Sequence, residues 1–200
     1  MDKILLVNGH QKQGNSAGRL NRTLCEQAER FFRKHGCDVR TTAIDGPYSI
    51  SGEVAKIAWA DAILFFTPVY WMSIPWGTKK YIDEVYMAGM GTLSTGDGRK
   101  KSDPEHGYGT GGLLKGKRYM LITTWNAPRG AFNDQSQFFE GKSVDDVFFH
   151  FHKAQQFLGL SPLESFSCHD VNKNPHIEAD LAGFEAHLMK VFGGELAKKS

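Results

Sequence analysis

Small and polar residues follow the first apolar run of this chain, in a pattern that suits phosphate binding. Residues 4–8 are nearly all apolar, Gly9 ends the run, and helical spacing of apolar residues begins at Leu20. A helix N-terminus leaves backbone N–H groups unpaired and carries a partial positive charge, and both favour a bound phosphate. Ser16, Asn21 and Thr23 could add side-chain donors there. A helix N-cap is the alternative role for Ser16.

The same loop lacks the glycine patterns of the best-known nucleotide sites. It contains neither the G-x-G-x-x-G of dinucleotide-binding Rossmann folds nor the G-x-x-x-x-G-K-[ST] of P-loop proteins. The sequence therefore favours a phosphate-binding loop of another kind.

Two further loops follow buried strands and carry aromatic side chains. The first runs from Pro68 to Trp76 and includes Tyr70, Trp71 and Met72. The second is the segment 124–128, Thr-Trp-Asn-Ala-Pro. A planar ring system such as an isoalloxazine would be well served by these residues, and a subunit interface is the alternative.

Other constellations of reactive residues are weak. His150, His152 and His169 have no acidic or cysteine partner at metal-ligand spacing, so we expect no metal. There is no G-x-S-x-G and no Ser/His/Asp signature of a hydrolase. A chain without an evident protein acid, base or nucleophile suits an enzyme whose cofactor performs the difficult step.

The composition is that of a globular protein of ordinary size. The chain has 200 residues, of which 40% are hydrophobic and 23% charged, and its formal net charge is +2. We expect one domain spanning residues 1–200, no nucleic-acid binding and no membrane insertion. The three widely spaced cysteines and the absence of a signal sequence predict reduced thiols and a cytoplasmic location.

Strand-like and helix-like segments alternate along the chain. Apolar runs predict strands at 4–8, 39–44, 62–66, 119–124 and 163–166. Helical spacing predicts helices at about 20–32, 53–59, 76–85, 147–158 and 177–192, with Pro75 as the possible first residue of the third. This alternation predicts an α/β fold: a flavodoxin-like, doubly wound five-stranded parallel sheet in the order 2-1-3-4-5, with helices on both faces.

A glycine-rich segment, Met87 to Gly116, separates the third helix from the fourth strand. Long loops in compact domains are usually functional or disordered. The composition alone supports equally a mobile surface excursion and a flap over a ligand at the carboxyl ends of the strands.

These motifs together resemble those of the flavodoxin-like NAD(P)H:quinone oxidoreductases, with the closest match among bacterial members. The resemblance extends from Ile4 to about Phe192, and several separated motifs carry it in order. They are S-x-G-x-L-N at 16–21, P-x-x-W-M-x-x-P-W at 68–76, KYID at 80–83, GTL at 91–93, YG-x-GGL at 108–113, TWNAP at 124–128 and FHKA-x-QFLG at 151–159.

The resemblance implies a homodimer with one FAD per subunit, which reduces quinones by two electrons with NADPH or NADH in a ping-pong reaction. It implies that the FAD phosphates are held by Ser16, Ala17, Gly18, Leu20, Asn21 and Thr23. The flavin ring and its chain would be lined by Pro68, Val69, Tyr70, Trp71 and Met72. The ring edge would contact Thr124, Trp125, Asn126 and Ala127, with Trp71 and Trp125 shaping the slot. Tyr108 would touch FAD from the glycine-rich segment, and His10 would contact the pyrophosphate. No side chain is assigned as a catalytic acid.

Two other functions remain open. Some relatives of these reductases are ancillary subunits of potassium-efflux systems, in which docking to a membrane protein is the decisive role. An FMN-dependent azoreductase or nitroreductase is the second alternative.

Overall fold

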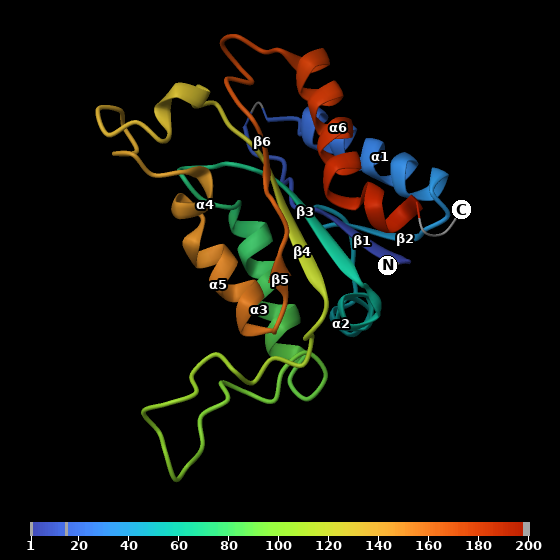
Figure 1. The fold of residues 1–200 in the computed structure, drawn as a ribbon, viewed down its shortest axis with the longest axis vertical. Coiled ribbons are helices and arrows are strands. Elements are labelled where there is room, and N and C mark those ends of the chain that lie inside the picture. Colours follow the sequence, from blue (N-terminus) through green and yellow to red (C-terminus); the bar gives the residue numbers. More distant parts are fainter. Residues whose placement is uncertain (1, 15, 198–200) are drawn as a thin grey trace.

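The computed structural model describes residues 2–14 and 16–197, and its centre is a twisted parallel sheet (Figure 1). The strands lie in the order β2-β1-β3-β4-β5, and β6 also pairs with β4. Every pairing is parallel. The strand bounds are β1 Lys3–Asn8, β2 Asp38–Ala43, β3 Ala62–Pro68, β4 Arg118–Thr124, β5 Ser161–Pro162 and β6 Phe166–Cys168. The predicted flavodoxin-like order 2-1-3-4-5 is confirmed.

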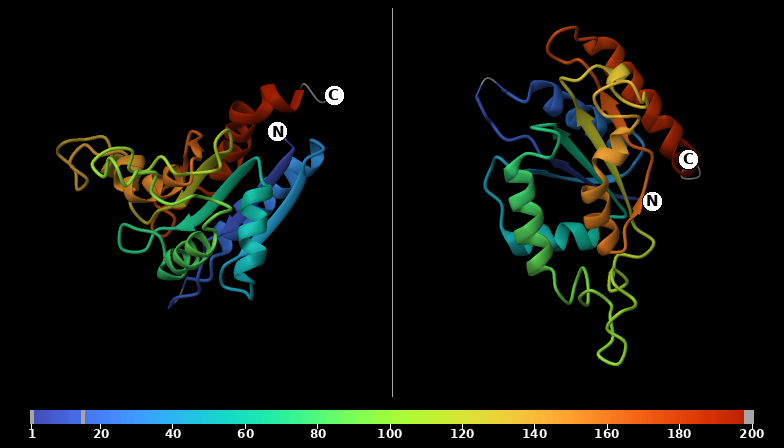
Figure 2. Two further views of the ribbon diagram at one scale, coloured as in Figure 1. Left: turned by 90° about the horizontal axis from the view of Figure 1, so that it is seen from below. Right: turned by 90° about the vertical axis from the view of Figure 1, so that its left-hand side faces the viewer.

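Helices cover both faces of this sheet, as predicted (Figures 1 and 2). One face packs against α2 (Ile50–Trp59), α3 (Trp76–Ala88), α4 (Val144–Val147) and α5 (Phe149–Phe157). The other face packs against α1 (Arg19–Lys34) and α6 (Ile177–Leu196). The central strands are apolar along most of their length because side chains of both faces are buried; every residue of β3 is buried.

The sheet edge differs from the prediction of one strand at 163–166. Two short segments, β5 and β6, share the fifth position, and residues 163–165 lie between them. β5 pairs with the start of β4 through Arg118 and Ser161, and β6 pairs with its end through Thr124 and Cys168. An edge strand has one neighbour only, so an interruption there leaves the rest of the ladder intact.

Two helix boundaries also differ. The predicted helix 147–158 is two helices, and α4 begins at a capping box in which Ser143 and Asp146 bind each other's backbone N–H. Pro75 is not the first residue of α3 but precedes it in an extended conformation. The fixed φ of proline suits both the first position of a helix and the position before it.

The glycine-rich excursion lies at the end of the sheet opposite to the α1 N-terminus (Figures 1 and 2). It leaves the C-terminus of α3 and returns to the start of β4. Its two legs bond to each other, since Gly109 N donates to Asp97 O at 2.7 Å and Leu113 N to Leu93 O at 2.9 Å. Leu93 and Leu114 are buried and fix its base to the core. Of the two alternatives that the composition left open, the flap over the carboxyl ends of the strands is therefore wrong within one chain.

Among residues 2–14 and 16–197, no helix is both long and apolar enough to cross a bilayer.

Candidate functional site

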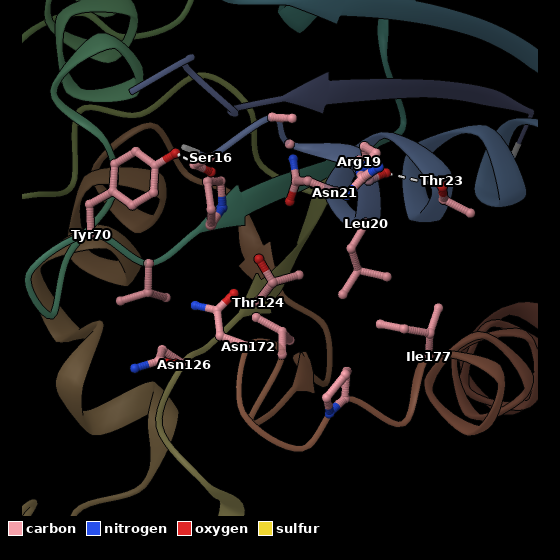
Figure 3. Close-up of a pocket in the computed structure, with 16 residues that line it drawn as sticks. Ser16, Arg19, Leu20, Asn21, Thr23, Tyr70, Thr124, Asn126, Asn172 and Ile177 are labelled. Atoms are coloured by element: carbon pink, nitrogen blue, oxygen red, sulfur yellow. Dashed lines mark hydrogen bonds between the residues drawn. The ribbon is translucent and has the colours of Figure 1, made fainter. Parts of the chain in front are cut away.

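A cavity of about 790 Å³ opens at the carboxyl ends of β1, β3 and β4 (Figure 3). Four segments line it: the loop into α1, the loop after β3, the loop after β4, and the loop between β6 and α6. Eleven residues that the sequence singled out line this cavity: Ser16, Ala17, Gly18, Leu20, Asn21, Thr23, Pro68, Val69, Tyr70, Thr124 and Asn126. Its size lies toward the upper end of the roughly 300–1,000 Å³ typical of small-molecule sites.

The N-terminus of α1 faces this cavity without a side-chain cap. Its N-cap residue is Gly18, with φ of 64°, so Ser16 is not the cap. A Cβ at Gly18 would lie 2.3 Å from the His10 ring, and glycine is therefore required for both conformation and space. The adjacent Arg19 adds a positive charge at the cavity wall. First-turn N–H groups and a guanidinium together form a suitable site for phosphate groups.

His10 supports this loop from below and does not line the cavity. Its ring is buried, and Nε2 lies 3.2 Å from the Ser16 carbonyl oxygen. A carbonyl can only accept, so Nε2 carries the proton in this contact. The expected contact between His10 and a pyrophosphate would require this ring to leave its place under Gly18.

Asn21 fastens α1 to the strand ends. The residue is 2% exposed, and its Nδ2 donates to the Asn8 Oδ1 at 2.7 Å and to the Phe66 carbonyl at 3.0 Å. Both partners are acceptors, which fixes the orientation of the amide group. Both amide hydrogens are used inside the protein, so the expected donation from Asn21 to a phosphate does not fit this geometry.

The hydroxyl groups of the phosphate loop are also engaged within the protein. The Thr23 Oγ1 donates to the Arg19 carbonyl at 3.0 Å. The Tyr70 hydroxyl lies 2.9 Å from the Ser16 Oγ and 3.0 Å from the Gln11 carbonyl, and so joins the loop after β3 to the phosphate loop (Figure 3). Ser16 can still present its remaining hydrogen-bonding capacity to a ligand.

The loop after β3 is a tight hairpin with a bulky tip. Tyr70 and Ser73 exchange two backbone hydrogen bonds of 2.9 and 3.2 Å. Trp71 and Met72 occupy the tip with φ of 49° and 62°, and the Trp71 side chain is 93% exposed. Neither tip residue lines the cavity of the single chain. A planar ligand or another subunit must cover Trp71 if its exposure has a function.

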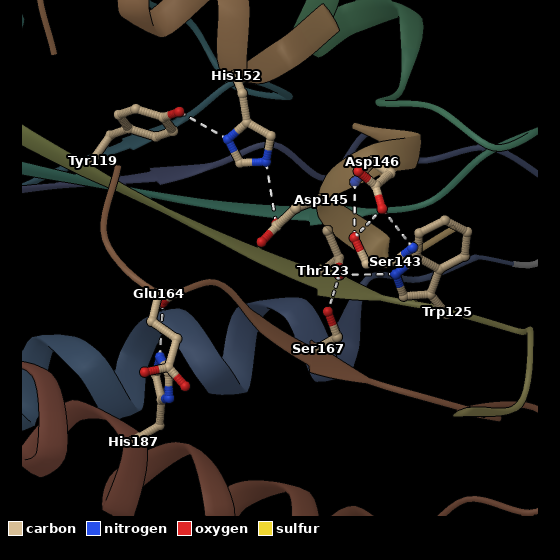
Figure 4. A network of polar contacts seen from close by, with 10 residues as sticks. All are labelled: Tyr119, Thr123, Trp125, Ser143, Asp145, Asp146, His152, Glu164, Ser167 and His187. Carbon is tan, nitrogen blue, oxygen red and sulfur yellow. Dashed lines mark hydrogen bonds and ion pairs between the residues drawn. The ribbon is translucent and has the colours of Figure 1, made fainter. Parts of the chain in front are cut away.

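Trp125 points away from the cavity, which corrects the expectation that its indole shapes the slot. It is 2% exposed, its Nε1 donates to the Thr123 Oγ1 at 2.9 Å, and Ser167 bonds to the same hydroxyl at 2.7 Å (Figure 4). Its ring packs edge-on against Phe132, Phe139 and Phe148. Its neighbours Thr124 and Asn126 point the opposite way, into the cavity, because side chains alternate along an extended segment.

Ala127 and Tyr108 also lie outside the cavity. The Ala127 carbonyl accepts from Asp170 N at 3.1 Å, which ties the loop after β4 to the loop after β6. Tyr108 lies on the excursion at the far end of the sheet, where it packs against Phe157. It is 71% exposed. A contact between Tyr108 and a ligand in this cavity therefore cannot come from the same chain.

Sequence reasoning missed one wall of the cavity. Arg19 and the residues of the loop after β6 line it as well: Val171, Asn172, Pro175 and Ile177. The available signal was positional, because the loop after the last strand also leaves the carboxyl end of a parallel sheet.

Two titratable groups behind this wall, His169 and Cys168, are uncharged at neutral pH. Burial and the Arg129 cation lower the pKa of His169 to about 4. Burial raises the pKa of the Cys168 thiol well above its ordinary value. Neither residue is therefore a candidate thiolate nucleophile or imidazolium acid. No group of three or more potential metal ligands occurs within residues 2–14 and 16–197.

We expect the replacement Asn21→Asp to destabilise the protein by about 3–5 kcal/mol, because a buried carboxylate would face the two acceptors Asn8 Oδ1 and Phe66 O. Urea unfolding of the flavin-free protein measures this change. Asn172→Asp is the matched control, since it makes the same chemical change at an exposed amide of the same cavity. Equal losses in the two variants would contradict the anchoring role of Asn21.

Comparison with known proteins places this fold among flavodoxin-like proteins. The model of the family described as having a flavodoxin-like fold matches residues 2–191. The chain is 49% identical to the NADPH:quinone oxidoreductase MdaB of Haemophilus influenzae over 190 residues, which cover 95% of this chain and 99% of that protein.

Solved structures share the fold at lower identity. A suggested quinone reductase from Klebsiella pneumoniae superposes with a TM-score of 0.73 at 23% identity, covering 95% of this chain and 83% of that one. The general stress protein 14 of Treponema denticola, solved in complex with FMN, gives a TM-score of 0.61 at 18% identity and 99% coverage of both chains.

Proposed function

The chain belongs to the family of proteins with a flavodoxin-like fold, and from this membership we propose that it is a flavin-dependent NADPH:quinone oxidoreductase. The observation that carries the proposal is the 49% identity to the Haemophilus influenzae enzyme over almost the whole length of both chains. The cavity at the carboxyl ends of the strands supports it, because ligands of open α/β sheets bind there. We propose NADPH as the reductant because the same relative is named an NADPH:quinone oxidoreductase.

FAD is the proposed cofactor because the cavity continues past the phosphate-binding loop. Gly18 and Arg19 at the α1 N-terminus suit the pyrophosphate. Beyond them, apolar side chains of Leu20 and Ile177 face the same space, and Figure 3 shows them on the side near α6. An adenine ring would fit between such side chains, whereas FMN would leave this end of the cavity empty.

In the mechanism we propose, the protein binds the flavin and the substrates, orients them and shields them from water. Bound FAD would supply the hydride transfer from NADPH to the quinone in two successive half-reactions. The α1 N-terminus and Arg19 would hold the phosphates throughout. Thr124 and Asn126 would bind the polar edge of the flavin ring, and the hairpin 70–73 would set the position of its face. Holding the rings in contact would provide most of the rate enhancement, because it removes the entropic cost of bringing the reactants together.

We also propose a homodimer, formed through the face that carries α3 and α5. α3, α5 and the loops that flank α3 carry five exposed large apolar side chains: Trp71, Trp76, Met87, Met90 and Phe149. Soluble monomers rarely leave so many large apolar side chains uncovered on one face. A second copy related by a twofold axis across the middle of α3 would bury both ends. It would also bring its own excursion, with Tyr108, toward the hairpin 70–73.

Reduced thiols support the cytoplasmic location that we propose. Cys25, Cys37 and Cys168 are all buried, and Cys25 and Cys168 are free thiols.

We expect the purified protein to oxidise NADPH only when a quinone is added, with parallel double-reciprocal plots, which are typical of a ping-pong reaction. Stopped-flow or steady-state measurement of the NADPH absorbance follows this reaction. Flavin-loaded protein that does not oxidise NADPH with any quinone, or that turns over azo dyes far better, would overturn the proposal.

A pair of glycine variants provides the control for this experiment. Gly18→Ala should lose flavin and activity, because its Cβ would overlap the His10 ring. Gly14→Ala places the same strain at φ of 52° but meets no atom within 4 Å, and should retain flavin.

For the dimer, we expect a solution mass of twice the 22.3 kDa of the chain. Met87→Glu, at the exposed C-terminal end of α3, should convert the dimer to monomer because it buries a carboxylate in the interface. Met189→Glu is the matched control, because Met189 is an exposed residue of α6, outside the proposed interface. This variant should remain dimeric. Light scattering after gel filtration measures the mass, and a monomeric wild type would contradict the proposed homodimer.

A further inference from the structure

The hairpin 70–73 stores backbone strain at its tip. Trp71 and Met72 both adopt positive φ, in the pattern of the two-residue turns that normally carry Asn-Gly. For residues with a Cβ, the left-handed conformation costs about 1–2 kcal/mol each. Such strain persists only where the surrounding structure holds the segment in place. The contacts of the two hairpin legs must therefore hold the strained tip in place.

Each leg of the hairpin is anchored by one of its own side chains, and the two side chains contact different elements. On the first leg, the Tyr70 hydroxyl bonds to Gln11 O and Ser16 Oγ of the phosphate loop. On the second leg, the Ser73 Oγ lies 3.2 Å from the Nε2 of His150, in the first turn of α5. The strained tip is therefore held by contacts to the phosphate loop on one leg and to α5 on the other.

The second anchor is a single shared hydrogen. Ser73 Oγ and His150 Nε2 can exchange donor and acceptor roles with the tautomer of the ring. Burial lowers the pKa of His150, as do the nearby His152 and Lys79, which favours the neutral ring.

Other charged groups around His150 are paired with each other. The groove beside it is lined from α3 by Lys79, Lys80, Asp83 and Glu84. Lys79 bonds to Asp83 and Lys80 to Glu84, at 2.5 and 2.7 Å. The partner that the structure gives to the His150 Nε2 is therefore Ser73, not a carboxylate.

We propose that His150 is a positioning residue: it holds the Ser73 leg of the hairpin and thereby fixes Trp71 and Met72 beside the cavity in which the flavin ring is to bind. The part that concerns flavin rests on the proposed function. The part that concerns the hairpin is a property of the free protein. His150 itself does not line the cavity, and no proton transfer to substrate is assigned to it.

Hydrogen–deuterium exchange of the flavin-free protein tests the anchor directly. The amides of Tyr70 and Ser73 close the hairpin, and we expect both to exchange about two- to tenfold faster in His150→Ala and in Ser73→Ala, as the loss of one hydrogen bond allows. The double variant should exchange no faster than either single one, and His150→Gln should restore protection through its amide. His187→Ala, which removes another surface histidine bonded to Glu164, is the control. Unchanged exchange in His150→Ala, or additive effects, would overturn the anchor.

Titration with FAD, followed by quenching of flavin fluorescence, tests the second part. We expect His150→Ala and Ser73→Ala to weaken FAD binding by the same two- to tenfold factor, with rescue by His150→Gln. A loosened hairpin with unchanged FAD affinity would overturn the positioning role while leaving the proposed function intact. Failure of the wild-type protein to bind FAD would instead overturn the proposed function, and the exchange results would be unaffected.

Discussion

The hydrogen bond between Asn8 and Asn21 is the constraint on which the rest of the site depends. Asn8 ends β1, and Asn21 lies in the first turn of α1. The Asn8 Oδ1 accepts from the Asn21 Nδ2 and also from the backbone N–H of His10. The second hydrogen of the Asn21 amide reaches the Phe66 carbonyl on β3. One buried amide thus joins two neighbouring strands, the loop that leaves β1 and the helix that follows it. A buried network of this kind is costly to disturb, because water does not replace the hydrogen bonds that are lost.

The other walls of the cavity are built outward from this point. With α1 held over the strand ends, Gly18 packs on His10 and the first turn of the helix faces the cavity. The Tyr70 hydroxyl then couples the phosphate loop to the hairpin after β3. The loop after β4 is held from behind by the buried indole of Trp125. A ligand that spans these loops would therefore meet a surface whose parts are fixed relative to one another, which lowers the entropic cost of binding.

Much of the fold could be predicted from the sequence because burial on both faces leaves a plain signal. The apolar runs 4–8, 62–66 and 119–124 lie within the three central strands. The edge was harder: residues 161–168 pair on one side only, so their short strands carry a weak pattern. The loops that line the cavity followed from the topology. Side-chain direction did not, since nothing local indicates that Trp125 faces the core while Thr124 and Asn126 face the cavity. The place of the excursion with Tyr108 stayed open between a flap and a surface loop because composition does not give the direction of a long insertion.

The central claim is that this cavity holds a flavin dinucleotide, from the hairpin at 70–73 to the N-terminus of α6. The most direct test is the mass of the flavin released when the purified protein is denatured. We expect FAD, in stoichiometric amount after incubation with excess FAD, because Leu20 and Ile177 line the space that we propose for the adenine half. Release of FMN, or no retained flavin after such incubation, would contradict it.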